Sequence, residues 1–157
     1  MRTRAAGLAD LDRELDRCQP TNSSLVVAYV DIVGLKTLND SKGHAAGDDL
    51  LKRVVATIRA HARSYDLSIR LGGDEFLWVM TDITLADMRH RFSQVAGALA
   101  ASPDTGAIRT GFAELRSDDD SADELIARAD GELLDNRPDR KPGRSRHVAR
   151  DDADHAR

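Results

Sequence analysis

The chain has 157 residues, of which 41% are hydrophobic and 32% charged, and its formal net charge is −4. This length suits one domain with a buried core, and the composition excludes a disordered chain. The net charge gives no general attraction to nucleic acid, and no apolar run reaches membrane-spanning length, so neither partner is expected. The single cysteine, Cys18, cannot form an internal disulfide, and no signal peptide is expected, which together favour a cytoplasmic location.

Helices and short apolar strands alternate along the chain, which is typical of a mixed α and β domain. In the first half, leucines at helical spacing predict a helix over residues 4–18, ended by Pro20 and the Thr-Asn-Ser-Ser that follows it. A continuous apolar run predicts a buried strand over 25–30. The polar segment 34–48 is predicted to form a short helical turn, a glycine-broken loop and the start of the next helix, and an amphipathic helix is predicted over 49–63.

The second half is predicted to hold a hairpin, a helix, a strand, a further helix and a weak last strand. Their ranges are 67–71 with 76–81, 84–99, 107–115, 121–136 and 147–149. This order predicts an α/β (α+β) fold with a mostly antiparallel five-stranded sheet flanked by helices. Its core is expected to be a ferredoxin-like or polymerase-palm-like βαββαβ unit. One domain is expected over 1–144, followed over 145–157 by the weak terminal strand and a disordered tail.

The hairpin turn carries the most distinctive residues, Gly72, Gly73, Asp74 and Glu75. Two glycines between strands indicate a tight turn in which both can adopt positive φ, and they let a ligand approach the backbone. Adjacent carboxylates on a turn suit Mg²⁺ bound to a nucleotide phosphate, with a solvated acidic turn as the alternative. Asp31, at the end of the preceding strand, is either a third metal ligand or a strand-end cap, and a split βαβ sheet would bring the three acids together.

The polar segment after Asp31 offers groups that can recognise a nucleotide. Asn39 and Asp48 carry hydrogen-bonding groups that can read the edge of a nucleobase, and Lys36 can contact a phosphate. Loop and helix-cap roles are the alternatives for all three residues.

Several motifs in order resemble the GGDEF domain of diguanylate cyclases. The signature is intact at 72–76, and residues 31–40 are similar to the family's D-x-D-x-F/L-K-x-x-N-D segment. Residues 43–48 match its G-H-x-x-G-D, residues 6–8 stand where it has T-G-L, and Ala129-Asp130 begins a degraded form of its C-terminal motif. The resemblance covers about residues 6–144.

The resemblance implies condensation of two GTP into cyclic di-GMP with release of two pyrophosphates, by a homodimer that uses Mg²⁺ or Mn²⁺. It implies that metal is bound by the Asp31 carboxylate, the Ile32 carbonyl, Asp74 and Glu75, one of the last two helping to deprotonate the 3′-hydroxyl. The GTP-binding residues it implies are Lys36 for phosphate, Asn39 and Asp48 for guanine, Gly72 and Gly73 in the turn, and Arg137 with Lys141 for phosphates.

A second site is suggested by Arg63 and Asp66, which form an R-x-x-D pattern. Five residues, 67–71, separate this pattern from the glycine pair. The family's product-inhibition site has this pattern and spacing. Arginine can bind phosphate or a guanine edge, and aspartate can accept from guanine N–H groups. A helix-end ion pair is the alternative.

Three departures from the family pattern bear on activity. Val33 replaces the second Asp of D-x-D, Arg109 stands where the pattern has Ser before x-Gly, and the C-terminal motif is altered around Arg137 and Lys141. A less acidic metal pocket and changed packing beside it are therefore expected. The alternative function is a catalytically weak or inactive GGDEF module that acts as a receptor for cyclic di-GMP or GTP.

Overall fold

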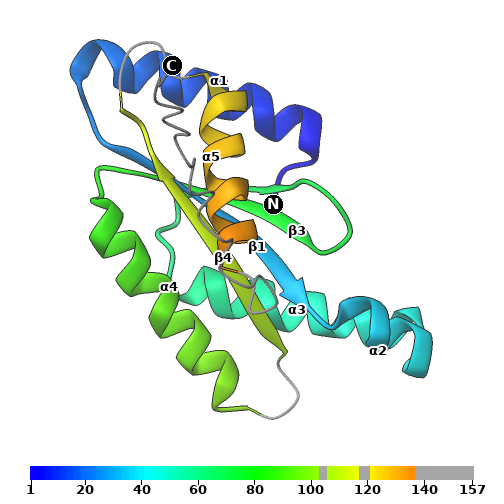
Figure 1. The fold of residues 1–157 in the computed structure, drawn as a ribbon. Coiled ribbons are helices and arrows are strands. Elements are labelled where there is room, and N and C mark those ends of the chain that lie inside the picture. Colours follow the sequence, from blue (N-terminus) through cyan, green and yellow to red (C-terminus); the bar gives the residue numbers. More distant parts are fainter. Residues whose placement is uncertain (103–105, 117–120, 137–157) are drawn as a thin grey trace, which may run out of the picture.

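The computed structural model describes residues 1–102, 106–116 and 121–136 of the chain (Figure 1). Its elements, in order, are α1 (Arg4–Thr21), β1 (Leu25–Val33), α2 (Leu35–Lys42), α3 (His44–Ala60), β2 (Leu67–Arg70), β3 (Glu75–Thr81), α4 (Leu85–Ala100), β4 (Ala107–Glu114) and α5 (Ala122–Asp135).

The described strands form one four-stranded sheet in the order β2-β3-β1-β4, and every neighbouring pair is antiparallel. This is the strand order of a ferredoxin-like βαββαβ unit, so the predicted fold is confirmed. The predicted fifth strand, at 147–149, and the acidic run at 118–120 lie outside the described residues.

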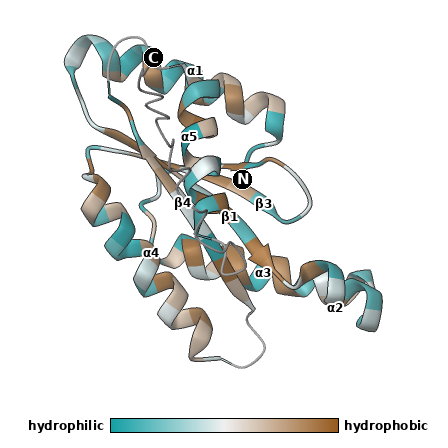
Figure 2. Cartoon of the chain, in the orientation of Figure 1, coloured by the Kyte–Doolittle hydropathy of each residue, from teal (hydrophilic) through white to brown (hydrophobic). Residues whose placement is uncertain are grey.

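Helices cover both faces of the sheet (Figure 1). Alternate β1 residues divide between two apolar cores: Val26, Ala28 and Val30 pack with α3 and α4, whereas Val27 packs with α1 and α5. Because successive side chains of a strand point to opposite faces, a central strand buried on both sides is apolar throughout. Figure 2 shows the result as a brown centre, whereas α2 projects from the sheet and is largely hydrophilic.

Most predicted elements are confirmed, and four local predictions were wrong. Helix α1 extends beyond the predicted 4–18, through Pro20 to Thr21, and it is capped by Asn22, which lies in the segment predicted to end the helix and adopts the left-handed conformation. Strand β1 extends through Val33, so the Asp31 carboxylate sits within the strand and not at its end. Helix α3 begins at His44, directly after Gly43 (φ 84°) and within the segment predicted to contain its start, but it ends at Ala60 and not at Arg63.

The fourth correction concerns the glycine turn. The described glycines with positive φ are Gly34, Gly43 and Gly106, so neither Gly72 nor Gly73 has the positive φ predicted for it. A Cβ on Gly73 would meet no heavy atom within 4 Å. Backbone strain therefore does not require glycine at either position. The effect of the two glycines is to leave the turn without side chains.

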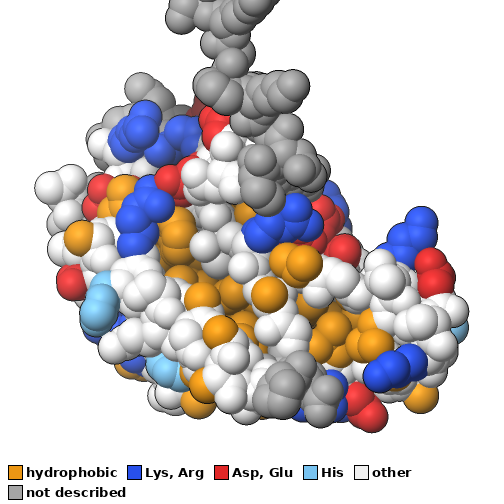
Figure 3. Space-filling model, turned by 60° about the horizontal axis from the view of Figure 1, so that its bottom comes forward, with side chains coloured by type: hydrophobic (Ala, Val, Ile, Leu, Met, Phe, Trp, Pro, Cys, Tyr) orange, Lys and Arg blue, Asp and Glu red, His pale blue; other side chains and the backbone are white. Residues whose placement is uncertain are grey.

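The lower end of the molecule has a mixed surface. Figure 3 brings this end forward and shows hydrophobic side chains across the middle of the face, with acidic and basic side chains around them.

Among the helices that the structure describes, none combines the length and the apolar character needed to cross a membrane.

Candidate active site

A row of three charged residues crosses the sheet beside the glycine turn. Asp31 on β1 lies opposite Glu75 on β3 and opposite Arg109 on β4. Directly paired residues of antiparallel strands project from the same face, so the three side chains share one face of the sheet. An Arg109 guanidinium nitrogen (Nη2) lies 2.8 Å from Asp31 Oδ2. Sequence reasoning foresaw altered packing at Arg109 but not this ion pair.

Backbone hydrogen bonds fix the turn against this row. The N–H of Ile32 donates to the carbonyl of Asp74 at 2.9 Å, and the N–H groups of Leu71 and Gly72 donate to the carbonyl of Glu75 at 2.9 and 3.2 Å. The predicted meeting of β1 with the glycine turn is therefore observed. It places Asp74 next to Ile32 in space as well as Glu75 next to Asp31.

Arg70, the last residue of β2, binds the backbone of the glycine turn. Its guanidinium Nε donates to the carbonyl of Gly72 at 3.0 Å, and its Nη2 donates to the carbonyl of Gly73 at 2.9 Å. The guanidinium fork can satisfy two carbonyls that a tight turn leaves without strand partners. Sequence reasoning missed Arg70, although a cation two residues before a Gly-Gly step is a usable signal.

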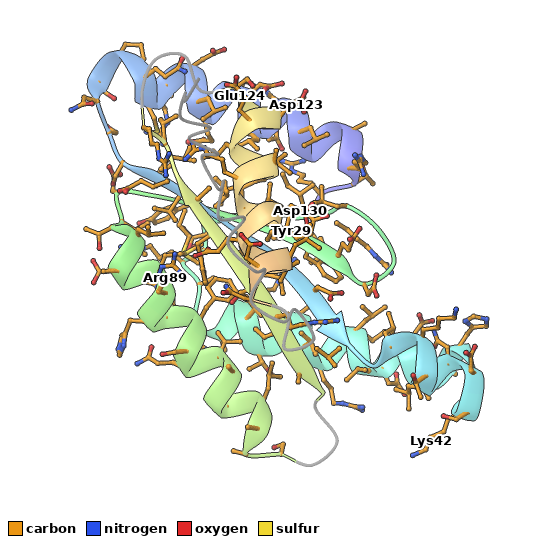
Figure 4. All side chains as sticks on the ribbon, viewed as in Figure 1. Tyr29, Lys42, Arg89, Asp123, Glu124 and Asp130 are labelled. Carbon is orange, nitrogen blue, oxygen red and sulfur yellow. The ribbon has the colours of Figure 1, made fainter. Side chains whose placement is uncertain are left out.

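Tyr29 stands on β1 two residues before Asp31, so its side chain lies on the same face of the sheet as those of Asp31 and Glu75. It is 8% exposed, and its pKa is raised to about 12, first by burial and then by the negative charges of Glu75 and Asp130. Figure 4 shows Asp130 of α5 beside Tyr29. The hydroxyl therefore keeps its proton at neutral pH and remains a hydrogen-bond donor for a neighbouring carboxylate.

The residues present fit a hard divalent cation only with help from other oxygen atoms. Mg²⁺ is commonly held by one or two carboxylates together with water and substrate phosphates, and Asp31 with Glu75 can supply that pair. Across residues 1–102, 106–116 and 121–136, no group of three or more His, Cys, Asp or Glu side chains is arranged to hold a metal ion. The other ligands would therefore come from backbone carbonyls, water or a nucleotide.

Helices α2 and α3 bring together the residues predicted to read guanine. Asn39 lies on α2, and Gly47 with Asp48 lies in the second turn of α3. Asn39 Oδ1 is buried and has no hydrogen-bond partner, whereas Asp48 and Lys36 are exposed. A buried acceptor without a partner is costly and is expected to be satisfied by a ligand or water.

The R-x-x-D residues line a separate cavity of about 800 Å³ between α1 and the end of α3. Arg63 donates from its side chain to the Tyr65 hydroxyl at 3.0 Å and to the Thr81 carbonyl at 3.3 Å. Its backbone N–H donates to Asp66 Oδ2 at 2.6 Å, which closes the turn after α3. Arg59 and Trp78 also line the cavity, whose volume suits a nucleotide-sized ligand.

Asp66 is only half satisfied in this position. Its Oδ1 is buried without a hydrogen-bond partner. Burial raises the pKa of Asp66, and the backbone N–H and the positive charge of Arg63 partly offset this rise.

The last two predicted residues, Arg137 and Lys141, lie outside the described residues, so their positions stay predictions.

Comparison with known families identifies this architecture. Residues 2–141 match the family model described as "Diguanylate cyclase, GGDEF domain". The chain belongs to the GGDEF family. The resemblance found in the sequence is thereby confirmed.

Individual relatives differ in their overall function. Diguanylate cyclase DgcP of Pseudomonas aeruginosa is 34% identical over 100 residues, which are 64% of this chain and 15% of DgcP. Cyclic di-GMP phosphodiesterase NbdA of the same organism is 39% identical over 82 residues, 52% of this chain and 10% of NbdA. The chain thus spans a small part of the length of these GGDEF-family relatives.

A solved structure shows the same fold. It describes an interaction of a microbial GGDEF domain with cyclic di-GMP, and it matches with a TM-score of 0.75 at 26% identity. The match covers 85% of this chain and 83% of the other.

Proposed function

We propose that this chain is the catalytic domain of a diguanylate cyclase, which condenses two GTP into cyclic di-GMP and two pyrophosphates. The observation that carries the proposal is the register that sets Asp31 opposite Glu75, next to the Ile32–Asp74 backbone hydrogen bond. It puts Glu75 of the family signature and Asp31 of β1 at one place on one face of the sheet. Membership of the GGDEF family and the relative DgcP support the same activity.

Each of the two bond-forming steps is a substitution at phosphorus. The oxygen of a ribose 3′-hydroxyl bonds to the α-phosphorus of the other GTP, and the bond from that phosphorus to the bridging oxygen breaks. Pyrophosphate leaves with the electron pair, and the hydroxyl proton passes to a base, for which Asp74 and Glu75 are the candidates. A divalent cation, Mg²⁺ or Mn²⁺, would neutralise the phosphates when bound by Asp31, Glu75 and the Ile32 carbonyl.

The chain's own residues also bind and orient the nucleotide in this proposal. Asn39 and Asp48 accept hydrogen bonds from guanine, and Lys36 contacts phosphate. The bare turn at Gly72 and Gly73 admits the nucleotide close to the backbone. Asp48→Ala is expected to weaken GTP binding, measured by calorimetry in the presence of Ca²⁺, and an unchanged dissociation constant would remove Asp48 from the guanine site.

The activity is tested by incubating concentrated protein with GTP and Mg²⁺ and separating the nucleotides by chromatography. Cyclic di-GMP is expected from the wild type and not from Glu75→Gln, which keeps the shape of the side chain but removes its charge. Asp12→Asn, at an exposed position of α1 that does not line the R-x-x-D cavity, is the control for removing a carboxylate charge and should keep full activity. Absence of product from the wild type at high concentration would refute catalysis by this chain.

Catalysis is proposed to need a homodimer, because each product molecule joins two GTP that must face each other. Specific activity should then rise with protein concentration and level off once the dimer is saturated. Specific activity that is constant down to concentrations where sedimentation shows only monomers would contradict this requirement.

A second candidate function is a cyclic di-GMP receptor or product-inhibited enzyme, acting through Arg63 and Asp66. The cavity of about 800 Å³ and the unpartnered Asp66 Oδ1 support it. Trp78 is the only tryptophan and lies in the wall of this cavity with 1% of its surface exposed, so a change in its fluorescence would report a rearrangement of that wall on binding.

Cyclic di-GMP titration separates this candidate from the helix-end interpretation of Arg63. Arg63→Ala is expected to abolish the fluorescence change, while Arg53→Ala, an exposed arginine of α3 that does not line the cavity, should leave it unchanged. Equal binding by both variants would refute the site. A receptor without catalysis would show the binding but no product from GTP.

A further inference from the structure

We infer that Arg109 is an internal cation that occupies the metal-binding aspartate, so that a divalent ion must displace it to bind. The inference rests on the proposed function, because it takes Asp31 as a metal ligand. It concerns a residue by which this chain departs from the pattern of its family, and it predicts a metal affinity set by the ion pair.

The contact itself is direct competition for one atom. Arg109 Nη2 lies 2.8 Å from Asp31 Oδ2, an oxygen that faces the same side of the sheet as Glu75. A carboxylate oxygen in a charge-assisted hydrogen bond with a guanidinium has its negative charge largely neutralised. A divalent ion that bound the same oxygen would bring a second positive charge to within a few ångström of the guanidinium, so the two cations exclude each other.

The burial of the two partners shows which of them can move. The side chain of Asp31 is 11% exposed and stands on the inner strand β1, whereas that of Arg109 is 38% exposed and stands on β4, the outermost strand on that side among the described residues. Arg109 Nε is buried without a hydrogen-bond partner, so the arginine is incompletely satisfied where it lies. Displacement therefore proceeds by rotation of Arg109 toward solvent, with Asp31 staying in place.

When a competing partner occupies Asp31, the apparent affinity for metal equals the intrinsic affinity multiplied by the fraction of molecules in which Asp31 is free. If the ion pair is formed in about nine of ten molecules, metal binds about tenfold more weakly than to the free carboxylate. A nucleotide reverses part of this loss, since its phosphates offer the displaced guanidinium another anion. Metal and nucleotide are therefore expected to bind cooperatively in this chain, and the coupling should depend on Arg109.

The test measures Mn²⁺ binding to the intact chain by the paramagnetic resonance of free Mn²⁺, without any turnover. The variants are Arg109→Ser, Arg109→Gln, Asp31→Asn and the double variant Asp31→Asn with Arg109→Ser. Arg53→Ser is the control for removing a positive charge elsewhere on the surface, and circular dichroism establishes that each variant is folded. A second series adds a GTP analogue with a methylene group between the α- and β-phosphorus.

Tighter Mn²⁺ binding by Arg109→Ser and Arg109→Gln, by about tenfold, with no gain in the double variant, supports the inference. Loss of the analogue's effect on Mn²⁺ affinity in Arg109→Ser also supports it. Equal affinity of wild type and both Arg109 variants, with Asp31→Asn still weakening binding, overturns it while the proposed metal site stands. Binding that is unchanged in Asp31→Asn overturns both the inference and the metal site.

Discussion

A Cβ atom on Gly47 would stand 1.8 Å from Oδ1 of Asn39. The close approach of α3 to α2 at this point thus depends on a glycine, and it fixes the amide that is proposed to read guanine. The clash in a Gly47→Ala variant involves the end of a side chain and not backbone. The chain can therefore fold around it by moving Asn39, and the damage should appear in binding.

Gly47→Ala is expected to weaken GTP binding about tenfold, the cost of roughly one hydrogen bond, with little loss of stability. Isothermal calorimetry with GTP and Ca²⁺ measures the first quantity and urea unfolding the second. Gly97→Ala is the matched control, because it is the same change in a helix with no heavy atom within 4 Å of the new Cβ. If both variants bind GTP like the wild type, Asn39 has no role in recognition.

Arg70→Gln is expected to loosen the glycine turn and lower cyclase turnover about tenfold or more, since reacting groups lose activity when slightly misplaced. The variant removes the donors to the carbonyls of Gly72 and Gly73. Faster amide hydrogen exchange at Gly72 is the second readout, because a general loss of activity would not produce it.

The control for Arg70 is Arg91→Gln, which removes a similar bond, from Arg91 to the carbonyl of His61 at 2.9 Å, far from the turn. It should leave exchange at Gly72 and turnover unchanged. Unaltered exchange in Arg70→Gln would show that the turn holds its shape without the guanidinium.

Gly111→Ala is expected to destabilise the fold by about 3 kcal/mol, the upper range for overpacking a core. A Cβ there would lie 2.0 Å from the carbonyl oxygen of Ala129 and 2.4 Å from the backbone nitrogen of Leu133, so α5 would have to move away from β4. Urea unfolding measures the change. Gly131→Ala, on α5 with open space around the new Cβ, should be neutral or stabilising.

The stability of the fold should depend on pH through Asp66. Burial raises the pKa of Asp66 in the folded chain, so between the ordinary aspartate pKa of 3.8 and the raised pKa the folded state binds more protons than the unfolded state. Stability contributed by the protonated form is therefore present below pH 3.8 and is lost as pH rises through the folded pKa.

Asp66→Asn removes this titration but keeps an oxygen that can accept from the Arg63 N–H. The free energy of unfolding of the variant should thus increase relative to that of the wild type on going from acid to neutral pH, because only the wild type loses stability over that range. Urea unfolding at several pH values measures the difference. A constant difference between the two proteins across that range would mean that burial does not perturb Asp66.

Local chemistry in the sequence was enough to predict most of the fold. The apolar run of β1 and the capping residue Ser121 carry their structural meaning within a few residues, and the Ser121–Glu124 capping box is present as predicted. The first residue of a helix without such a cap was harder to predict. Helix α3, for example, begins at His44 after a glycine and has no side-chain cap. The positive φ predicted for Gly72 and Gly73 was wrong because strand pairing and Arg70 shape that turn.

By itself the sequence determined the family, the order of the elements and the identity of the acids at the signature, because these depend on residue type and on spacing along the chain. Only the tertiary structure decided that Asp31 faces Glu75 on one side and Arg109 on the other. That arrangement depends on the register of β1 with two strands that are distant in sequence, and a shift of one residue would turn the side chains to the other face of the sheet. The ion pair at Asp31 is therefore a property of the folded sheet.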